Sequence, residues 1–312
     1  MEKCLWPKGK GGRMKPLTLT LCIPVMNQLH DCRSALGLFR YNTSEDTEFC
    51  IIDNGSTDPY EDFIVNTLKP KKLNFIRNES NIGMIKTMQQ AYENCTTDIL
   101  AVTHNDVFLY EKDWDKRILK YFEEMPDLGG IGTFGSQGVG PRGERIQDVP
   151  RAGMMAGWSN MLEAEVHGMR LYQDWVPASI FDGFFMAFRM DVLKKSGGID
   201  QRYQYHHFYD RSLSLQSLAL GYKNIVVNIP CHHWSGMTAN RAEYQTWINK
   251  ELSKEAADSS THDQNMALFE KIWGDVLPLY VENDFSFRKG QQGTWDFKGD
   301  SIVGFDWRRP LK

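Results

Sequence analysis

Apolar residues recur at strand and helix spacing along the first third of the chain. The segment Leu17–Pro24 alternates Leu with Thr before an apolar end, and Glu48–Asp53 is a second apolar run followed by polar residues, so both are predicted strands. Between them, Asp31–Arg40 has the spacing of an amphipathic helix. Strand, helix and strand in this order predict one βαβ unit with parallel strands.

The same alternation continues to residue 106. A helix is predicted near Pro59–Leu68, a strand at Leu73–Arg77, a helix over Ile82–Asn94 and an apolar strand at Ile99–Thr103. Strands that alternate with helices indicate a mostly parallel sheet. Ligands of such sheets bind beyond the carboxyl ends of the strands. In this chain, polar clusters follow two of those ends.

The middle of the chain, residues 129–177, is rich in glycine and has few clear periods, so we expect loops over the site. From Phe181 the periodic pattern returns. We predict strands at Phe184–Phe188 and Asn224–Ile229, a helical turn at Met190–Lys195, and helices at Asp210–Ala219, Glu243–Lys250 and His262–Trp273. Residues 282–312 are polar and aromatic and give no assignment.

Composition is that of a globular protein. The 312 residues suffice for about two domains, or for one α/β domain with a sizeable core. Hydrophobic residues make up 41%, charged residues 24%, and the formal net charge is only −4, so neither disorder nor a general affinity for nucleic acid is indicated. We therefore expect a small or neutral partner.

Cysteines and apolar runs bear on the compartment. The six cysteines form no C-x-x-C pair, which argues against a zinc module and a dense disulfide framework and favours a reducing, cytoplasmic compartment. Basic residues before Leu17 imitate a secretory signal, but Pro24 cuts the apolar run, so a buried strand is the better interpretation and Met14 is an alternative start. No other segment approaches the roughly 20 apolar residues that span a bilayer. We expect peripheral membrane contact at most.

Asp53 ends the second predicted strand and is followed by Asn54, Gly55, Ser56 and further polar residues. Gly55 allows a tight turn, and the carboxylate of Asp53 can accept a hydrogen bond from the imide N–H of a uracil or a similar base edge. The alternative is an Asx turn with a helix cap. This segment by itself leaves both interpretations open.

His104, Asn105 and Asp106 follow an apolar strand. A carboxylate in such a loop can hold Mg²⁺ or Mn²⁺ that bridges a diphosphate, because these ions take oxygen ligands and keep waters. His104 favours Mn²⁺. His232 and His233 are further candidates, but adjacent residues of an extended segment face opposite sides, so we expect at most one ligand. Hydrogen-bonded surface histidines are the alternative.

Asp210 lies at the start of a predicted helix. Taken alone, it fits a helix N-cap or a partner for Arg211. The functional interpretation is a general base that takes the proton from an attacking hydroxyl.

Taken in order, these segments resemble the family 2 glycosyltransferases of the GT-A fold, particularly bacterial O-antigen and rhamnosyltransferase-like members. The resemblance covers roughly residues 17–274. The segments that carry it are Pro24 with Asn27, Asp53–Asp58, Asn81 with Gly83, His104–Asp106, Phe181–Asp200, Asp210, His233 with Gly236, and a C-terminal helix with Asn265, Phe269, Lys271 and Trp273.

The resemblance implies a fold and a division of the chain. The expected fold is a GT-A type, Rossmann-like α/β fold, with a mixed, mostly parallel sheet flanked by helices and a C-terminal helical extension. Residues 1–16 would be an N-terminal tail and residues 17–240 the catalytic domain, with a donor half at about 17–110 and an acceptor half at about 111–240. Residues 241–312 would form C-terminal helices and a tail.

The resemblance also implies an activity: inverting transfer of a sugar from a nucleotide-diphosphate donor to an acceptor hydroxyl, in glycan or polysaccharide synthesis. The cofactor would be Mn²⁺ or Mg²⁺, and the acceptor a glycan or glycolipid. By this resemblance Asp210 is the catalytic base, the metal is held by Asp106, His104 and His233, the donor nucleotide is bound by Pro24, Asn27, Asp53, Asn54, Ser56, Asn81, Gly83, Lys86 and Asn105, and the acceptor or sugar contacts Asp182, Gly183, Tyr209 and Trp234.

The chain departs from the family pattern at three positions. His104 replaces the first Asp of the Asp-x-Asp segment, which leaves the metal open, and Tyr209 and Ser212 replace Glu and a second Asp, which leaves the acceptor open. A nucleotidyltransferase, which needs no acceptor base, and a non-catalytic carbohydrate-binding protein are the alternatives. A dinucleotide-dependent dehydrogenase is excluded, because no G-x-G-x-x-G follows the first strand.

Overall fold

The computed structural model describes residues 15–146, 158–159, 169–234, 258–282, 296–298 and 302–311. In its N-terminal part, four parallel strands lie side by side in the order β4, β1, β2, β3. Their bounds are β1 Leu19–Val25, β2 Glu48–Asp53, β3 Leu73–Arg77 and β4 Ile99–Thr103. The helical segments that connect them are α1 Leu29–Asn42, α2 Tyr60–Asp62 with the π-helix Phe63–Leu68, and α3 Met84–Asn94.

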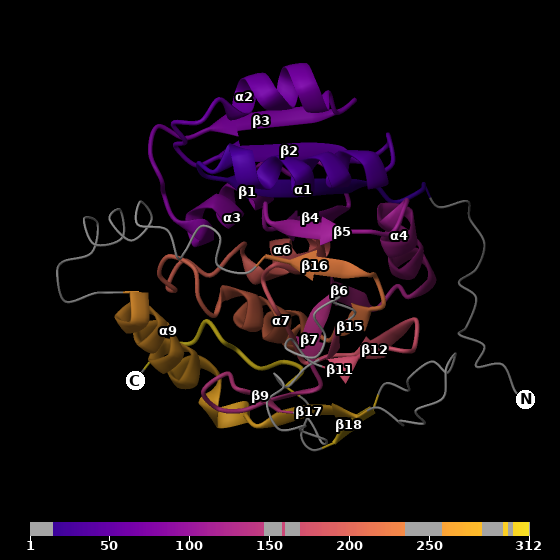
Figure 1. Ribbon diagram of the computed structural model, residues 1–312. Helices are drawn as coiled ribbons and strands as arrows, with labels where there is room; N and C mark the ends of the chain where they lie inside the picture. The colour runs from indigo at the N-terminus through magenta and orange to yellow at the C-terminus, as the bar shows by residue number, and fades with distance from the viewer. Residues whose placement is uncertain are drawn as a thin grey trace, which may run out of the picture.

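Four later strands extend this sheet beyond β4, below the N-terminal part in Figure 1. β14 is antiparallel to both β4 and β6, β15 is parallel to β6, and β12 forms the antiparallel edge. Their bounds are β6 Leu128–Gly132, β12 Trp175–Pro177, β14 Phe185–Arg189 and β15 Lys223–Val227. The prediction of a mixed, mostly parallel sheet is therefore confirmed.

The prediction of loops throughout residues 129–177 is wrong, because this region contains β6 and β12 of the main sheet. A Cβ on Gly132 would lie 2.6 Å from the ring of Phe181, and one on Gly130 would lie 2.6 Å from the ring of Phe188. Glycine makes room for these rings, and its lack of a side chain removes the apolar period that marks a strand.

Short strands of the same region and of the C-terminal part form smaller sheets. One has the order β11-β10-β7-β13 and another the order β18-β17-β8-β9. Their bounds are β7 Phe134–Ser136, β8 Gly138–Val139, β9 Arg145–Ile146, β10 Trp158–Ser159, β11 Met169–Arg170, β13 Ile180–Phe181, β17 Leu279–Glu282 and β18 Asp296–Lys298. β5 (Val107–Leu109) pairs with β16 (Cys231–His233) in a two-stranded sheet.

Helices cover both faces of the main sheet. Successive residues of β1 point into different cores, with Leu21 among α1 and α4 and Cys22 among α3, α6 and α7. The later helices are α4 Trp114–Glu124, α6 Met190–Ser196, α7 Tyr209–Ala219, α9 Asp258–Trp273 and the 3₁₀ turn η2 Gly274–Val276. The helix predicted at residues 243–250 lies outside the described residues.

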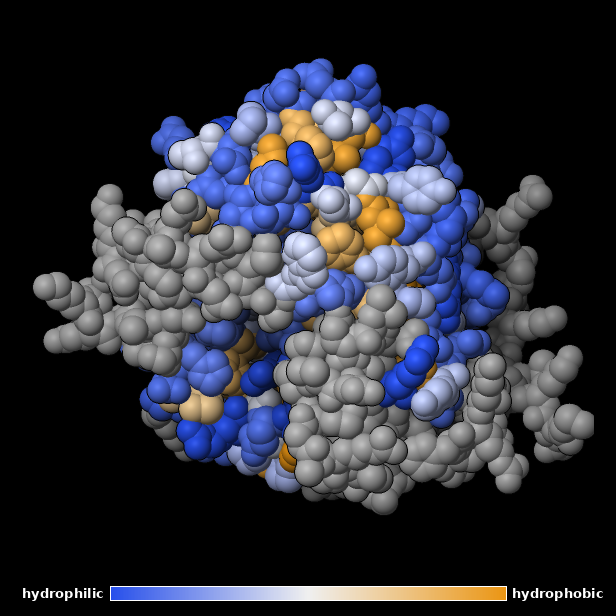
Figure 2. All heavy atoms as spheres, viewed as in Figure 1, coloured by the Kyte–Doolittle hydropathy of each residue, from blue (hydrophilic) through white to orange (hydrophobic). Residues whose placement is uncertain are grey.

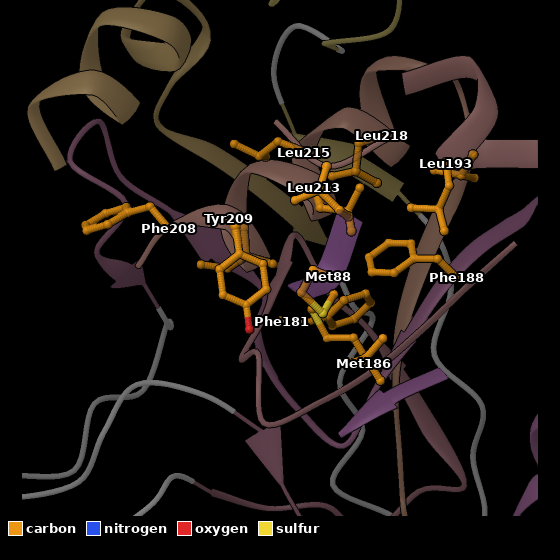
Figure 3. Packing of buried hydrophobic residues seen from close by; sticks show 14 of the residues in the cluster. Met88, Phe181, Met186, Phe188, Leu193, Phe208, Tyr209, Leu213, Leu215 and Leu218 are labelled. Carbon is orange, nitrogen blue, oxygen red and sulfur yellow. The ribbon is translucent and has the colours of Figure 1, made fainter. Parts of the chain in front are cut away.

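Aromatic and aliphatic side chains join α6 and α7 to the sheet. Figure 3 shows Leu193 of α6 and Leu213 of α7 close to Phe188 of β14, and all three are at most 3% exposed. This core fixes α7, whose first turn carries Asp210, against the sheet.

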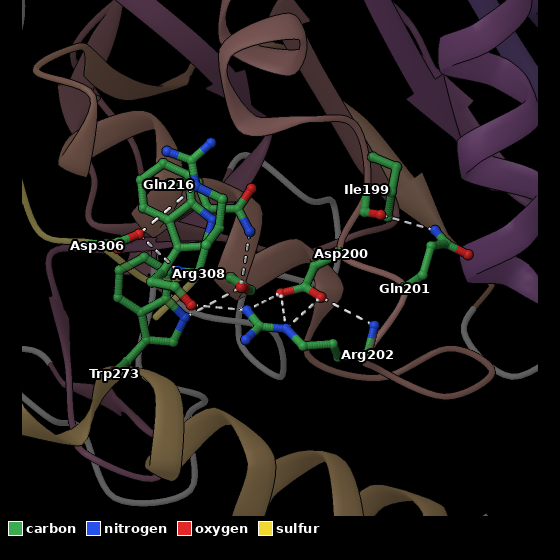
Figure 4. Close-up of polar contacts among 10 residues, drawn as sticks. Ile199, Asp200, Gln201, Arg202, Gln216, Trp273, Asp306 and Arg308 are labelled. Carbon is green, nitrogen blue, oxygen red and sulfur yellow. Dashed lines mark hydrogen bonds and ion pairs between the residues drawn. The ribbon is translucent and has the colours of Figure 1, made fainter. Parts of the chain in front are cut away.

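Residues 302–311 follow α9 and the small sheets and pack on the same core. The ring of Trp307 is stacked on that of Trp273, with centroids 6.1 Å apart. Arg202 pairs with Asp200 at 2.7 Å and donates a hydrogen bond to the Trp307 carbonyl at 2.9 Å (Figure 4). The C-terminal segment thus shares a hydrophobic cluster with α7.

Two further sequence predictions concern membranes and cysteines. Within the described residues, every helix is too short or too polar to cross a membrane. The five cysteines in this part of the chain are free thiols.

Candidate functional site

Three side chains that could hold a metal converge where β4, β5 and β16 meet. His104 follows β4, Asp106 precedes β5, and His233 ends β16. One ligand atom of each residue lies within 4.8 Å of the other two. His233 Nε2 lies 3.3 Å from His104 Nδ1 and 3.4 Å from Asp106 Oδ1.

The donor atoms of this group fit a divalent cation. Asp106 Oδ1 is buried, and no group in the described part of the chain satisfies the geometry of a hydrogen bond to it. Burial, with a contribution from His233, lowers the pKa of His104 to about 4, so this imidazole is neutral near pH 7. Burial alone would raise the pKa of Asp106, but the two histidines outweigh it and lower that pKa. Neutral imidazoles and an ionised carboxylate are the forms that bind metals.

The two adjacent histidines face different sides of β16, as the alternation of an extended segment predicts. The ring of His233 is stacked on Phe184, with centroids 4.7 Å apart, and belongs to the candidate metal group. The ring of His232 instead contacts Phe108, with centroids 5.8 Å apart.

Asp210 is the second residue of α7 and lies in its first turn. The N-cap is Phe208, so the expectation that Asp210 could be the N-cap is wrong. Its Oδ2 accepts a hydrogen bond from the Gly183 N–H at 3.0 Å, and its Oδ1 accepts one from the Arg211 N–H at 2.9 Å. Burial raises the pKa of Asp210, Asp182 adds to the rise, and Arg211 opposes it. A carboxylate with a raised pKa is a better proton acceptor when ionised.

The segment Asp182–Phe184 contacts both the metal group and Asp210. Asp182 forms an ion pair with Arg145, and Phe184 accepts the His104 N–H at 2.9 Å through its carbonyl. Burial favours the neutral acid, but Arg145 and the two metal-group histidines lower the pKa of Asp182. A Cβ on Gly183 would lie 2.5 Å from the Tyr209 hydroxyl, so glycine permits this close packing.

The expected donor loops form two hydrogen-bonded clusters at the carboxyl ends of β1 and β2. In the first, Asn27 donates through its N–H to Ser56 Oγ at 2.8 Å and accepts the Thr57 N–H at 2.8 Å. Asp53 is fully buried, accepts the Ser56 N–H at 2.8 Å and forms an ion pair with Arg77. Its carboxylate therefore holds the loop in shape.

The second cluster joins the end of β2 to the start of α3. Asn54 donates to Asn81 Oδ1 at 2.6 Å, and the Gly83 N–H donates to the same oxygen at 2.9 Å. Gly83 has φ +83°, a conformation that favours glycine. Lys86 lies on the exposed side of the first turn of α3.

Three remaining candidates lie beside these groups. Pro24 is part of β1 and is paired with Ile52 of β2. Asn105 is buried and lies between His104 and Asp106 in the chain. Trp234 donates its N–H to the Asp106 carbonyl at 3.1 Å, but its ring contacts Phe108.

Sequence reasoning missed Arg77, Arg145 and Phe184, which hold Asp53, Asp182 and His233 respectively. Arg145 lies in the glycine-rich region that gave no pattern, and Phe184 read only as the start of a strand. A register for β2 and β3 would have found Arg77, because it pairs directly with Asp53.

The sequence profile described as "Glycosyltransferase like family" matches residues 70–270 of the chain. No curated protein sequence matches it.

Two solved structures have a similar fold. The mannosyltransferase PcManGT from Pyrobaculum calidifontis, in complex with GDP-Man and Mn²⁺, has a TM-score of 0.52 and 17% identity, over 78% of this chain and 64% of that one. GalNAc-T7 with UDP, GalNAc and Mn²⁺ has a TM-score of 0.60 and 12% identity, and the match covers 83% of this chain and 49% of that one. The chain thus covers less than two thirds of either protein, and at these identities the likeness concerns the fold.

Proposed function

The chain belongs to the glycosyltransferase-like family whose profile matches residues 70–270, and we propose that it transfers a sugar from a nucleoside-diphosphate donor to an acceptor hydroxyl with inversion. The observation that carries the proposal is the juxtaposition of two groups. The candidate metal group consists of the neutral imidazole of His104, the carboxylate of Asp106, whose buried Oδ1 has no hydrogen bond among the described residues, and His233. The segment Asp182–Phe184 joins this group to Asp210.

The donor nucleotide would lie over the two hydrogen-bonded clusters at the ends of β1 and β2. This is where ligands of parallel α/β sheets bind. The residues assigned to it are Pro24, Asn27, Asn54, Ser56, Asn81, Gly83, Lys86 and Asn105, together with Asp53, which is fully buried and would act by holding the loop that carries Ser56. The complexes of the two similar structures, with GDP-Man or UDP and with Mn²⁺, support a nucleotide-sugar donor here.

His104, Asp106 and His233 would hold the divalent cation, with Mn²⁺ favoured by the two imidazole nitrogens. Bound there, the cation supplies positive charge against the charge that grows on the leaving diphosphate.

Asp210 would act as the general base. The acceptor oxygen attacks the anomeric carbon from the face opposite the leaving group, a new C–O bond forms as the bond to the diphosphate oxygen breaks, and Asp210 takes the hydroxyl proton. The Gly183 N–H holds one carboxylate oxygen in place, and alignment of acceptor and base provides much of the rate gain. Asp182, Gly183, Tyr209 and Trp234 would contact the sugar or the acceptor, for which we propose a glycan or glycolipid.

A panel of nucleotide sugars tests the proposal. The melting temperature of the protein would be measured with each donor, with and without Mn²⁺, followed by mass spectrometry of released nucleoside diphosphate. A true donor should stabilise the protein by mass action only with metal present, and should be turned over. A non-catalytic carbohydrate-binding protein would release no nucleoside diphosphate, and a nucleotidyltransferase would transfer the nucleoside monophosphate and release sugar 1-phosphate instead.

A further inference from the structure

Four aromatic side chains gather on one face of the two-stranded sheet β5–β16, and we call this set, Phe108, Tyr110, His232 and Trp234, the ring face. Phe108 is at its centre. Its ring is stacked on that of Tyr110, with centroids 6.5 Å apart, and contacts Trp234 at 5.6 Å and His232 at 5.8 Å. His232 and Trp234 are also in contact, at 6.1 Å.

The alternation of side chains along the two strands produces this face. Val107, Leu109 and Cys231 are fully buried and point into the core beneath. Phe108 and His232, which are directly paired across the sheet, therefore point outward.

The ring face is accessible to solvent. Trp234 is 47% exposed and Tyr110 46% exposed. Figure 2 shows hydrophobic and near-neutral side chains at the centre of this view, in the region where Figure 1 draws β5 and β16. A single exposed aromatic residue needs no explanation, but a contiguous set of rings marks a binding surface.

The chemistry of these side chains favours a neutral, polyhydroxylated ligand. Phe108, Tyr110 and Trp234 carry no formal charge near pH 7, so the face offers no ionic partner for a charged ligand. Flat ring faces suit the C–H face of a pyranose. The hydroxyl of Tyr110 and the indole N–H of Trp234 can bond to hydroxyl groups at its edge.

The ring face is continuous with the metal group. Asp106 directly precedes β5, and its carbonyl accepts the Trp234 N–H at 3.1 Å. His233 lies between His232 and Trp234 in the chain. From Phe108 to Tyr110 the strand leads about 7 Å further from this group. A saccharide that extends from the metal group along β5 would therefore contact several of these rings in succession.

We propose that the ring face binds neutral sugar rings of an acceptor chain beyond the reacting residue. This inference rests on the proposed function for its substrate class and makes the acceptor a saccharide of more than one residue. Its recognition is independent of metal and donor, since the four rings contact the ligand without them.

Binding of neutral oligosaccharides to protein labelled with 5-fluorotryptophan tests the inference. The probes are maltohexaose, mannohexaose and chitohexaose, with glucose, mannose and N-acetylglucosamine as monosaccharide controls. Fluorine NMR titrations would follow the Trp234 resonance, assigned with Trp234→Phe, and calorimetry would give affinities for Trp234→Ala and Tyr110→Ala. The matched control is Tyr172→Ala, which removes a 60% exposed aromatic ring outside the ring face.

We expect at least one hexasaccharide to shift the Trp234 resonance and to bind about tenfold more tightly than its monosaccharide. Affinity should fall at least about tenfold in both face variants and stay unchanged in Tyr172→Ala. The inference is overturned if none of the three hexasaccharides binds, if Trp234→Ala binds as tightly as wild type, or if phosphatidylcholine vesicles alone are bound through Trp234.

A second readout separates this inference from the proposed function. Stabilisation of Tyr110→Ala by nucleotide sugar and Mn²⁺ should equal that of wild type. If wild type shows no such stabilisation but still binds a hexasaccharide through Trp234, the proposed transfer fails while the ring face stands. If stabilisation occurs without saccharide binding, the ring-face inference alone fails.

Discussion

His232 and His233 are neighbours in β16, yet only His233 belongs to the candidate metal group. They provide a matched pair of variants. His233→Ala should weaken Mn²⁺ binding by roughly tenfold or more, because it removes one of three ligands that converge on the ion. His232→Ala should bind Mn²⁺ like wild type. Electron paramagnetic resonance titration of free Mn²⁺ measures both, and equal losses in the two variants would contradict the assignment.

Asp210 is not the N-cap of α7, which is Phe208, although its Oδ1 accepts the Arg211 N–H in the first turn. Asp210→Asn should lower transfer by roughly 10²-fold or more, because an amide cannot take the acceptor proton. Its single oxygen can accept only one of the N–H groups of Gly183 and Arg211, so we expect a small fall in melting temperature and little change in donor affinity. Steady-state transfer, donor calorimetry and thermal denaturation check the three expectations. Transfer near the wild-type rate would show that Asp210 is not the base.

The pH dependence of transfer follows from the raised pKa of Asp210. Transfer needs the ionised carboxylate, so the rate should fall as pH decreases through this pKa, at a higher pH than for an ordinary aspartate. Asp182→Asn removes a negative charge that raises the pKa, and should move the fall to lower pH. Rate profiles at saturating Mn²⁺ measure this shift, and a move to higher pH would contradict it.

At the scale of single residues, the sequence predicted which side chains gather but left their partners open. Asp53 was expected either to read a base edge or to shape a turn. In the structure, one of its oxygens accepts the Ser56 N–H and the other forms an ion pair with Arg77. Arg77 comes from the neighbouring parallel strand, and the pattern of one strand says nothing about its register with another.

The segment between β13 and β14 packs against the start of α7 at Gly183. In Gly183→Ala the new Cβ would meet the Tyr209 hydroxyl at 2.5 Å, so the segment or the ring has to move and the bond to Asp210 is disturbed. We expect transfer to fall at least about tenfold. Adding Tyr209→Phe, which removes the hydroxyl, should restore part of the rate. A double variant no faster than Gly183→Ala would exclude this clash as the cause.

Gly37 in α1 is the control for that substitution, because a Cβ there meets nothing within 4 Å. Gly37→Ala should leave transfer unchanged. It should stabilise the protein by about 0.5–1 kcal/mol, since alanine in a helix interior loses less conformational entropy on folding. Chemical denaturation measures the difference.

At the scale of elements, strong periods predicted well and glycine-rich segments did not. The strands at Glu48–Asp53, Leu73–Arg77 and Ile99–Thr103 were predicted at their observed bounds. β6 was missed because Gly130 and Gly132 receive aromatic rings from Phe188 and Phe181. Such a strand owes its burial to residues about fifty positions later, which no local window contains.

Trp307 links the C-terminal segment to the rest of the molecule. Its side chain is 3% exposed, stacked on Trp273 and part of the cluster that includes α7. Trp307→Ala should lower the free energy of unfolding by about 3–5 kcal/mol, through lost burial and the cavity that remains. Urea denaturation measures this loss. The control is Trp234→Ala, which removes a 47% exposed side chain and should lower the free energy of unfolding by less than about 0.5 kcal/mol.

At the scale of the molecule, the alternation of strands and helices predicted the N-terminal half of the sheet. The patterns at Phe184–Phe188 and Asn224–Ile229 predicted two strands of its continuation, β14 and β15. The small sheet of β8, β9, β17 and β18 was not predicted, because its strands are only two to four residues long and come from distant parts of the chain. The division at residue 240 remains a proposal. Its test is whether residues 241–312 unfold separately from the sheet, which the shared Trp307 cluster argues against.

Calorimetric titration of the donor identified by the panel, with and without Mn²⁺, into wild type and Asp106→Ala tests the central claim most directly. Asp106 carries a buried oxygen with no hydrogen bond among the described residues, 3.4 Å from His233 Nε2, and its loss should remove one metal ligand while the two imidazoles remain. We predict that Mn²⁺ strengthens donor binding to wild type and has no effect on donor binding to Asp106→Ala. Equal Mn²⁺ dependence in the two proteins would contradict a metal-assisted transfer at this site.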